Sequence, residues 1–175
     1  KSDKFLQKLE QFDRVIIAGQ AKSHCVAWTI ADLLSDLQAR KERLVEKIFL
    51  LEDCTSPVVV PGIVDYTDQA DAAFARFAEA GMHIVLAEVA ATPQSREIGL
   101  MMRERLGPNE GMLFVFEEPR AYCFWMRNTL LPLSIAFLDD DGRIVNIADM
   151  KPRSEDSHCA AAPVRFALEM EKGWF

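Results

Sequence analysis

Short continuous runs of apolar residues alternate with helix-spaced apolar residues in the first half of the chain. Residues 15–18 and 48–51 are such runs, and a third begins at residue 83; runs of this kind are typical of strands buried on both faces. The apolar spacing between them predicts one helix that starts at Cys25 and another over residues 67–81. Strands and helices that alternate in this order predict a parallel sheet with right-handed crossovers.

Three local signals refine this prediction. Apolar side chains at helical spacing predict a short helix within residues 1–12. Two prolines and a glycine predict a loop over residues 55–66. Thr67 is suited to cap the helix that follows this loop, and Gly81 is suited to end it.

The pattern changes in the second half of the chain. Residues 95–106 form a short helical candidate, and beyond them apolar and polar residues alternate over residues 133–147. The acidic turn 139–142 interrupts this alternation, which predicts a β-hairpin. We therefore expect a second domain that is β-rich and antiparallel, with one or two helices.

Length and charge narrow the possible classes of protein. A chain of 175 residues allows one ordinary domain or two small ones, and the change of pattern places the boundary between residues 1–85 and 86–175. The net charge of −7 includes no basic stripe that could bind nucleic acid. No apolar run approaches the roughly 18 residues of a membrane-spanning helix, and no secretory signal peptide is recognisable. The chain begins at Lys1, so we expect an excerpt of a longer protein.

The four cysteines stand far apart in the sequence and form no CxxC pair. A disulfide framework or a zinc ribbon would place them closer together, so this spacing favours a reducing, cytoplasmic compartment. Cys25 is the one with a suggestive context, because the stretch "GQAKSHCV" lies between a predicted strand end and a predicted helix start. A helix N-terminus can activate a thiol as a nucleophile; a buried structural cysteine behind a tight turn is the alternative interpretation.

The segments "RVIIAGQAKSHCVAWTIADLL", "KIFLLEDCTSPV" and "ADAAFARFAEAGMHIV" resemble the C-terminal half of the isochorismatase-like cysteine hydrolases, close to nicotinamidases. The resemblance covers about residues 5–85. It implies that Cys25 attacks a carboxamide carbonyl, that the amides of Ala21 and Cys25 form the oxyanion hole, and that the Gln20–Ala21 peptide is cis. It also implies a partial Rossmann-like parallel sheet with helices and a small carboxamide as substrate.

The chain departs from this family upstream of Cys25. The family uses an aspartate at the end of its first strand and a lysine from the middle of the domain. Both lie upstream of the segment that matches Gly19–Val26, as do the metal ligands of some members, and only 24 residues precede Cys25 here. Without a base, turnover by this chain alone is not expected. We expect no metal and no cofactor. His24 could form a Cys–His dyad and Asp53 could join the site, although adjacent residues point apart and Asp53 is suited to cap a loop.

The second half carries the motifs Gly99-Leu100-Met101, Gly111-Met112, Phe124-Trp125-Met126, Asn128-Thr129 and Leu168-Glu169. With these motifs, residues 86–175 look like a bacterial family known only as domain of unknown function 192. This resemblance implies a compact β-rich domain, which makes the whole chain an α/β domain followed by a small β-rich α+β domain. It implies no established chemistry.

The second half also suggests a binding site. A set of methionines and aromatic residues suits an irregular core; alternatively the set lines an apolar groove for a peptide or small ligand, with Arg127 and Asn128 as its polar edge. The set is Met101, Met112, Phe114, Phe116, Phe124, Trp125 and Met126. A metal site of Glu155, Asp156, His158 and Cys159 is a weaker alternative, because adjacent residues seldom converge on one ion.

Two functions therefore stay open. The first is a nicotinamidase-like amidohydrolase fragment, and the second is a non-catalytic binding or structural module carried by the β-rich domain. Because half of a sheet would expose the strand at residues 15–18, self-association is also expected.

Overall fold

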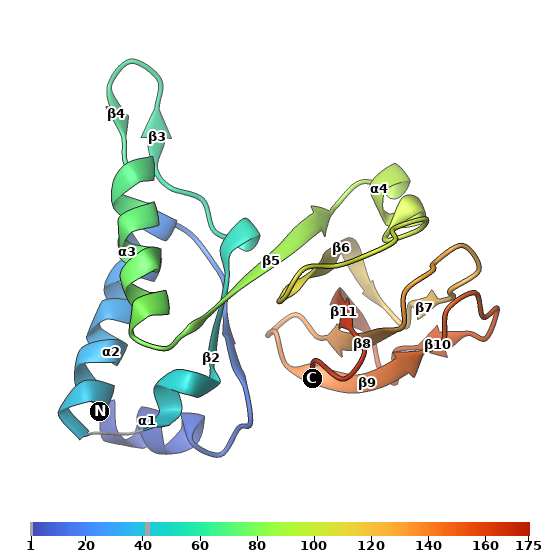
Figure 1. Ribbon diagram of the computed structural model, residues 1–175, viewed down its shortest axis with the longest axis horizontal. Coiled ribbons are helices and arrows are strands. Elements are labelled where there is room, and N and C mark those ends of the chain that lie inside the picture. The colour runs from blue at the N-terminus through green and yellow to red at the C-terminus, as the bar shows by residue number, and fades with distance from the viewer. Residues whose placement is uncertain (1, 41–42) are drawn as a thin grey trace. The chain divides into compact units, whose positions relative to one another are not determined.

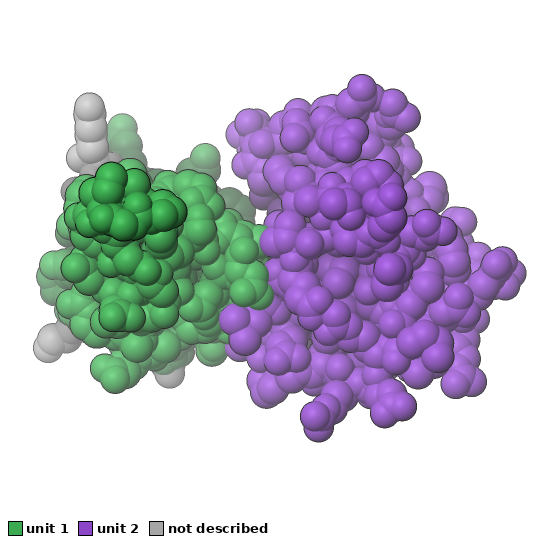
Figure 2. Space-filling model, turned by 90° about the horizontal axis from the view of Figure 1, so that it is seen from above, with its two compact units in different colours: residues 1–85 green, residues 86–175 purple. Residues whose placement is uncertain are grey.

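The computed structural model describes residues 2–40 and 43–175. The chain divides into two compact units, residues 1–85 and residues 86–175, which Figure 2 shows in different colours. Among the described residues, no helix has the length and apolar character that crossing a membrane requires.

The first unit alternates helices and strands (Figure 1). Its elements, in chain order, are α1 (Ser2–Leu9), β1 (Val15–Ile17), a π-helical turn (Lys22–Val26), α2 (Ala27–Arg40), a 3-10 turn (Arg43–Lys47), β2 (Ile48–Leu51), a second 3-10 turn (Glu52–Cys54), β3 (Val59–Val60), β4 (Val64–Asp65), α3 (Thr67–Glu79) and β5 (His83–Ala90). β2 pairs in parallel with β1 on one side and with the first three residues of β5 on the other. The predicted parallel sheet is thus confirmed.

The core of the first unit follows from the apolar spacing of its helices. Ile30 and Leu37 lie on one face of α2, and both are fully buried in the same cluster as Phe77 of α3 and Leu50 of β2. Gly81, with a φ of +104°, ends α3 as expected, because that conformation is open to glycine at little cost.

Three expectations for the first unit need correction. The predicted loop 55–66 contains the short antiparallel pair β3–β4. Thr67 is the first residue of α3 and not its cap: the N-cap position is Tyr66, which makes no side-chain cap hydrogen bond. Asp65 Oδ1 instead accepts from the Thr67 amide at 2.9 Å and from the Thr67 hydroxyl at 2.6 Å, since an aspartate readily bonds the backbone two residues ahead. The strand β1 is half-buried rather than buried on both faces, because it lies at the edge of the sheet. Self-association through this edge stays a prediction.

The second unit is β-rich. It begins within β5 and continues with α4 (Pro93–Ile98), β6 (Glu110–Arg120), β7 (Cys123–Phe124), β8 (Leu133–Leu138), β9 (Ile144–Met150), β10 (His158–Cys159) and β11 (Val164–Glu171). The helix α4 is shorter than the predicted 95–106. Thr92 and Ser95 form a capping box at its start, and Gly99 ends it with a φ of +52°.

The strand β11 lies in the centre of the second unit (Figure 1). It pairs in antiparallel fashion with β6 on one side and with β8 on the other, and β8 pairs with β9 as the predicted hairpin. The whole sheet has the order β1-β2-β5-β6-β11-β8-β9, with β6 parallel to the second part of β5. The chain therefore has a mixed α/β fold, with a parallel part and an antiparallel part.

Candidate functional site

The segment that carries Cys25 forms a sharp connection between β1 and α2. The chain leaves β1 at Ile17, passes the Gln20–Ala21 peptide, and enters the π-helical turn that leads directly into α2. The Gln20–Ala21 peptide is cis, as the resemblance implies, and Cys25 is exposed to solvent. The alternative of a buried structural cysteine is therefore wrong.

The neighbours of Cys25 do not complete an active site. Within the residues that the structure describes, no side chain forms a hydrogen bond with its sulfur. His24 is engaged elsewhere: its Nδ1 lies 2.8 Å from the Ser23 hydroxyl, and its ring packs edge-on against Trp28 and Tyr66. The structure thus gives His24 no role as a base for Cys25. The oxyanion hole formed by the amides of Ala21 and Cys25 stays a prediction.

Lys22, three residues before Cys25, is held by two carboxylates. Its Nζ lies 2.7 Å from Glu52 Oε1 and 2.6 Å from Asp71 Oδ1, and the side chain is only 5% exposed. Burial disfavours the charged ammonium, but both carboxylates stabilise it more strongly, so the pKa of Lys22 is raised above its ordinary value. This lysine is a structural cation and is not free to serve Cys25.

Asp53 and Cys54 lie in the 3-10 turn after β2. Burial raises the pKa of the Cys54 thiol to about 11, and the negative charge of Asp53 adds to this effect. Cys54 is therefore an inert thiol at neutral pH.

A cavity of about 210 Å³ lies within the second unit. Its walls come from α4 and the turn after it, from β6, from β7 and from β11. The lining residues are Arg96, Glu97, Ile98, Gly99, Leu100, Met101, Phe114, Phe116, Tyr122, Cys123, Phe124, Trp125, Thr129 and Glu169. Met101 and all four aromatic residues predicted to line a groove are thus brought together around one cavity. The core interpretation also holds for part of the set, since Met112, Phe114, Phe116 and Met126 are buried in the core of the second unit.

The aromatic residues of the cavity pack against one another in a defined way. Phe116 stacks on Tyr122 with a centroid distance of 3.6 Å, and Phe124 packs edge-on against Phe114 at 4.9 Å. Trp125 is 45% exposed, so it reaches solvent from the same lining. These contacts hold the rings as fixed walls.

Glu169 is the unusual member of this lining. It lies in the middle of β11, opposite Met112 on one neighbouring strand and Ile135 on the other, and it is 5% exposed. Its carboxyl group forms no hydrogen bond or ion pair with any residue that the structure describes. Burial alone raises its pKa to about 8.

Thr129 shares this property with Glu169. Among the described residues, five polar side chains are buried, and those of Lys22, Thr55 and Ser134 are hydrogen-bonded. The side chains of Thr129 and Glu169 have no such bond within the described part of the chain, and both face the cavity. Buried polar groups are almost always satisfied, so the cavity is the place where their partner would lie.

The cation beside the cavity is already engaged. One nitrogen of Arg96 donates to the Ala91 carbonyl at 2.7 Å and to the Val115 carbonyl at 2.8 Å. Its guanidinium also lies over the Phe116 ring, 5.5 Å from the centroid. Arg96 therefore forms part of the wall and does not neutralise Glu169.

The predicted polar edge of the groove is wrong. Arg127 pairs with Glu155 and lies over Trp125, and Asn128 contacts the sulfur of Met101, but neither lines the cavity. Glu169 was missed because β11 reads as alternating apolar and polar positions, which places a glutamate on a solvent-exposed face. The available signal was Ala167, since an alanine on that same face indicates close packing there.

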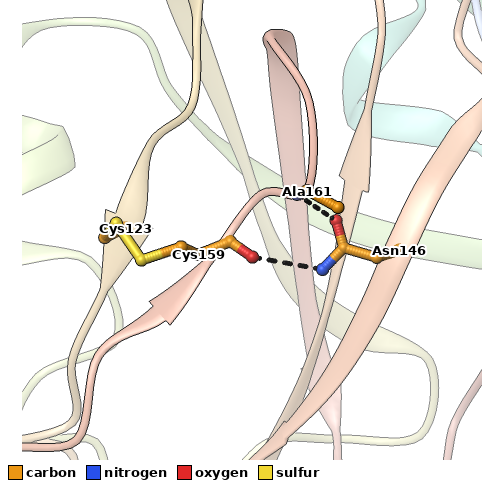
Figure 3. Close-up of a disulfide and its surroundings, with 4 residues drawn as sticks. All are labelled: Cys123, Asn146, Cys159 and Ala161. Carbon is orange, nitrogen blue, oxygen red and sulfur yellow. Dashed lines mark hydrogen bonds between the residues drawn. A yellow bond between two sulfur atoms is a disulfide. The ribbon is translucent and has the colours of Figure 1, made fainter.

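Cys123 and Cys159 form a disulfide between β7 and β10 (Figure 3). Asn146 supports it: its side-chain amide donates to the Cys159 carbonyl at 3.2 Å and accepts from the Ala161 amide at 2.9 Å. The argument from cysteine spacing fails here, because the antiparallel pairing of β7 with β10 brings together two cysteines that are 36 positions apart. The inference of a reducing compartment loses its basis, since disulfides persist in oxidising environments.

The disulfide also removes the weaker metal alternative. A cysteine in a disulfide has no thiolate to offer a metal, and the described residues contain no group of three or more His, Cys, Asp or Glu side chains arranged to hold an ion. Glu155 is paired with Arg127 and Asp156 accepts from Ser154.

The chain resembles known proteins in its second half. A model of the family DUF192, described as an uncharacterized ACR, matches residues 75–175. A solved structure of a protein of unknown function from Novosphingobium aromaticivorans is 41% identical over 51% of this chain, with a TM-score of 0.50. A "putative transcription regulator" from Sinorhizobium meliloti matches with the same identity, share of this chain and TM-score. The chain covers 64% of the first protein and 70% of the second. No curated protein matches it.

Proposed function

The chain belongs to the DUF192 family, and from this premise we propose that its second unit is a non-catalytic module that binds a small ligand in the cavity around Glu169. One observation carries the proposal: a buried carboxyl group without a hydrogen-bond partner among the described residues faces a cavity with aromatic walls. Such a group costs stability unless something binds it. Ligand sites typically combine an apolar lining with a few polar groups of this kind.

The size of the cavity limits the ligand. An engineered apolar cavity of about 150 Å³ in another protein takes up benzene. A cavity of about 210 Å³ therefore has room for a ring or a short chain of about six to eight heavy atoms. Ligands of this size bind with dissociation constants of about 0.1–10 mM, which is within the range of an NMR titration.

The test uses 1-pentanol as a neutral probe of the cavity and the full chain labelled with 15N. We expect the NMR chemical shifts to change only at the lining residues, and these changes to saturate as the concentration of 1-pentanol rises. Met101→Trp adds an indole at a half-buried lining position and is expected to weaken the binding at least about tenfold, because it fills the space. Shift changes that do not saturate, or that spread over the surface, would overturn the proposal.

The matched control is Met102→Trp. Met102 is the next residue, is 69% exposed and does not line the cavity, so this variant is expected to bind 1-pentanol as the unchanged chain does. Equal loss in both variants would show that the effect comes from the added indole and not from the cavity.

A second candidate function rests on the first unit. The exposure of Cys25 at the entrance to α2 favours a nucleophilic thiol, in an amidohydrolase fragment of nicotinamidase-like descent that acts on a small carboxamide. The parallel strands β1, β2 and β5 would be the remaining part of a Rossmann-like sheet. An aspartate and a lysine would have to come from outside residues 1–175.

The test of this second candidate is the alkylation rate of Cys25 with iodoacetamide against pH. An ordinary thiol loses its rate tenfold for each pH unit below about 8.5, whereas an activated nucleophile keeps its rate down to about pH 7. Cys54, whose pKa burial raises to about 11, serves as the unreactive internal control. A rate for Cys25 that falls as an ordinary thiol's does would refute this candidate.

A further inference from the structure

Within the described part of the chain, the Glu169 carboxyl has no cationic partner. Among the described residues no cation pairs with its carboxyl, and Arg96, the basic residue of the lining, donates to two backbone carbonyls. The second unit as a whole has 14 acidic and 10 basic residues. An anionic ligand would meet an acidic surface and an acidic group inside the cavity, so the electrostatics favour a cation.

The walls of the cavity favour the same charge. Four of the lining side chains are Phe or Tyr, and a fifth is Trp125. Aromatic rings attract cations through the negative charge of their faces, and they also bury an alkyl chain favourably. A cationic head on a short apolar chain therefore matches both parts of the lining.

The number of acceptors favours an ammonium over a guanidinium. The two carboxyl oxygens of Glu169 and the hydroxyl of Thr129 provide three acceptor atoms at the cavity. An ammonium has three N–H donors on one atom, whereas the planar fork of a guanidinium turns two of its five N–H groups to a carboxylate and points the other three away from it, towards the aromatic lining. Unmatched buried donors weaken binding.

Resting on the function proposed above, we infer that the ligand of this cavity is a primary alkylammonium group, which pairs with Glu169 and Thr129 while its chain lies between the aromatic rings. Free short-chain amines and the side chain of a lysine in a peptide share this chemistry. A lysine side chain has about five heavy atoms beyond its Cα, and an amine with a five-carbon chain has about six. Both sizes agree with a cavity of about 210 Å³.

Ion pairing would require Glu169 to lose its proton. The buried carboxyl has a pKa of about 8, so at pH 7 it is mostly protonated. The other ionisable groups of the lining are Arg96, Glu97 and Tyr122, and none of them pairs with Glu169. An ammonium in the cavity stabilises the carboxylate, so binding at pH 7 releases close to one proton into the buffer.

The experiment compares three probes of equal length on the full chain: pentylamine, 1-pentanol and pentanoate. We expect pentylamine to bind about 10–100-fold more tightly than the other two. Calorimetry in two buffers with different ionisation enthalpies reports the released proton. An Nα-acetylated lysine methylamide tests the second source of the same group: tighter binding than pentylamine assigns the site to a lysine side chain, and weaker binding assigns it to a free amine.

The variant Glu169→Gln keeps the size of the side chain and cannot ionise. It is expected to weaken the binding of pentylamine about 10–100-fold and to abolish proton release. The dissociation constant of 1-pentanol is expected to change by less than about threefold. The matched control Glu171→Gln changes an exposed glutamate two residues along the same strand and is expected to change neither probe. Thr129→Val is expected to weaken pentylamine less, by about 3–10-fold.

The outcomes separate the two proposals. If 1-pentanol binds in the cavity and pentylamine binds no better, or if Glu169→Gln binds pentylamine unchanged, the ammonium inference is wrong while the binding module stands. If pentanoate binds most tightly, the cavity prefers a negatively charged ligand that accepts hydrogen bonds, and the ammonium inference is also wrong. If none of the three probes shifts the lining residues, both proposals fail.

Discussion

Among the described residues, each unit buries one ionisable side chain, and the two differ in whether they have a partner. Lys22 in the first unit and Glu169 in the second are both 5% exposed. Lys22 is held by Glu52 and Asp71 at hydrogen-bond distance. Glu169 lies opposite Met112 and Ile135 in the centre of a sheet, without a partner among the described residues.

The difference indicates which site is structural and which is open to a ligand. The ammonium of Lys22 has exchanged water for carboxylates of the same unit, so nothing further is needed to satisfy it. Glu169 is buried without such an exchange among the described residues, and it faces a cavity. Natural proteins give up stability in this way at functional sites.

The largest expected effect comes from the strand pair that carries Glu169. Gly111 on β6 lies against β11 so closely that an added Cβ would overlap the carbonyl oxygen of Glu169 and the sulfur of Met170. Gly111→Ala is therefore expected to destabilise the second unit by about 4 kcal/mol. Hydrogen exchange, read separately over residues 1–85 and 86–175, should show the loss only in the second range.

The control for this substitution is Gly142→Ala. Gly142 has a φ of +74° but open space around its Cβ position, so alanine there costs only about 1–2 kcal/mol. Similar losses of stability at the two positions would mean that the close approach of β6 to β11 is not what makes alanine costly at position 111.

The next effect concerns the disulfide. Cys123→Ser opens a covalent loop that joins residues 36 positions apart, and a disulfide typically contributes about 2–4 kcal/mol to stability. Urea unfolding followed over the second unit should show this loss, and the same loss should appear when the unchanged chain is reduced. If reduction leaves the stability of the unit unchanged, the pairing of Cys123 and Cys159 does not support the cavity wall to which Cys123 contributes.

The elements that could be predicted from the sequence are those whose apolar pattern depends on local geometry. The run 48–51 is a strand buried at all four positions, and the hairpin around 139–142 forms as its alternation indicates. The family of residues 86–175 could also be identified from its motifs.

The parts that could not be predicted depend on contacts between distant residues. The partner of Cys123 is set by the pairing of β7 with β10, which no spacing rule contains. Glu169 looks exposed in an alternating strand, and only the chains on both sides of β11 show that it is buried. At Cys25 the sequence placed the thiol correctly at the start of a helix, but the engagement of Lys22 with Asp71 needed the packing of α3.

The pH dependence of stability distinguishes the two buried groups. The pKa of Glu169 is about 8 in the folded chain and about 4.5 in a free side chain. The folded chain therefore keeps a proton that the unfolded chain loses, and stability falls as the pH rises from about 4.5 to 8, by about 1.4 kcal/mol per pH unit at most. Below this window the contribution is fully present, and above it no further change follows.

Glu169→Gln is expected to remove this loss. The variant should match the unchanged chain at pH 5 and exceed its stability by about 2 kcal/mol at pH 7. Urea unfolding at both pH values measures the difference, with Glu171→Gln as the exposed control. A variant that is less stable at pH 7 would show that the carboxyl has a structural role, and the contrast with Lys22 would disappear.

The smallest effect is expected at Lys22 itself. Lys22→Met keeps the apolar stem and removes the charge, and the freed Glu52 and Asp71 side chains, which are 29% and 58% exposed, can be hydrated. The expected loss is about 1 kcal/mol in the first unit at pH 7, against a negligible change for Lys8→Met on the exposed face of α1.

The sign of the pH dependence completes this prediction. The folded-state pKa of Lys22 is raised above the ordinary 10.5, so its ion pairs stabilise the chain throughout the neutral range and lose this effect only as the pH rises above that value. The difference between Lys22→Met and the unchanged chain should therefore be constant from pH 5 to 8, the range over which Glu169 titrates. A difference that changes across this range would mean that Lys22 is not fully paired with Glu52 and Asp71.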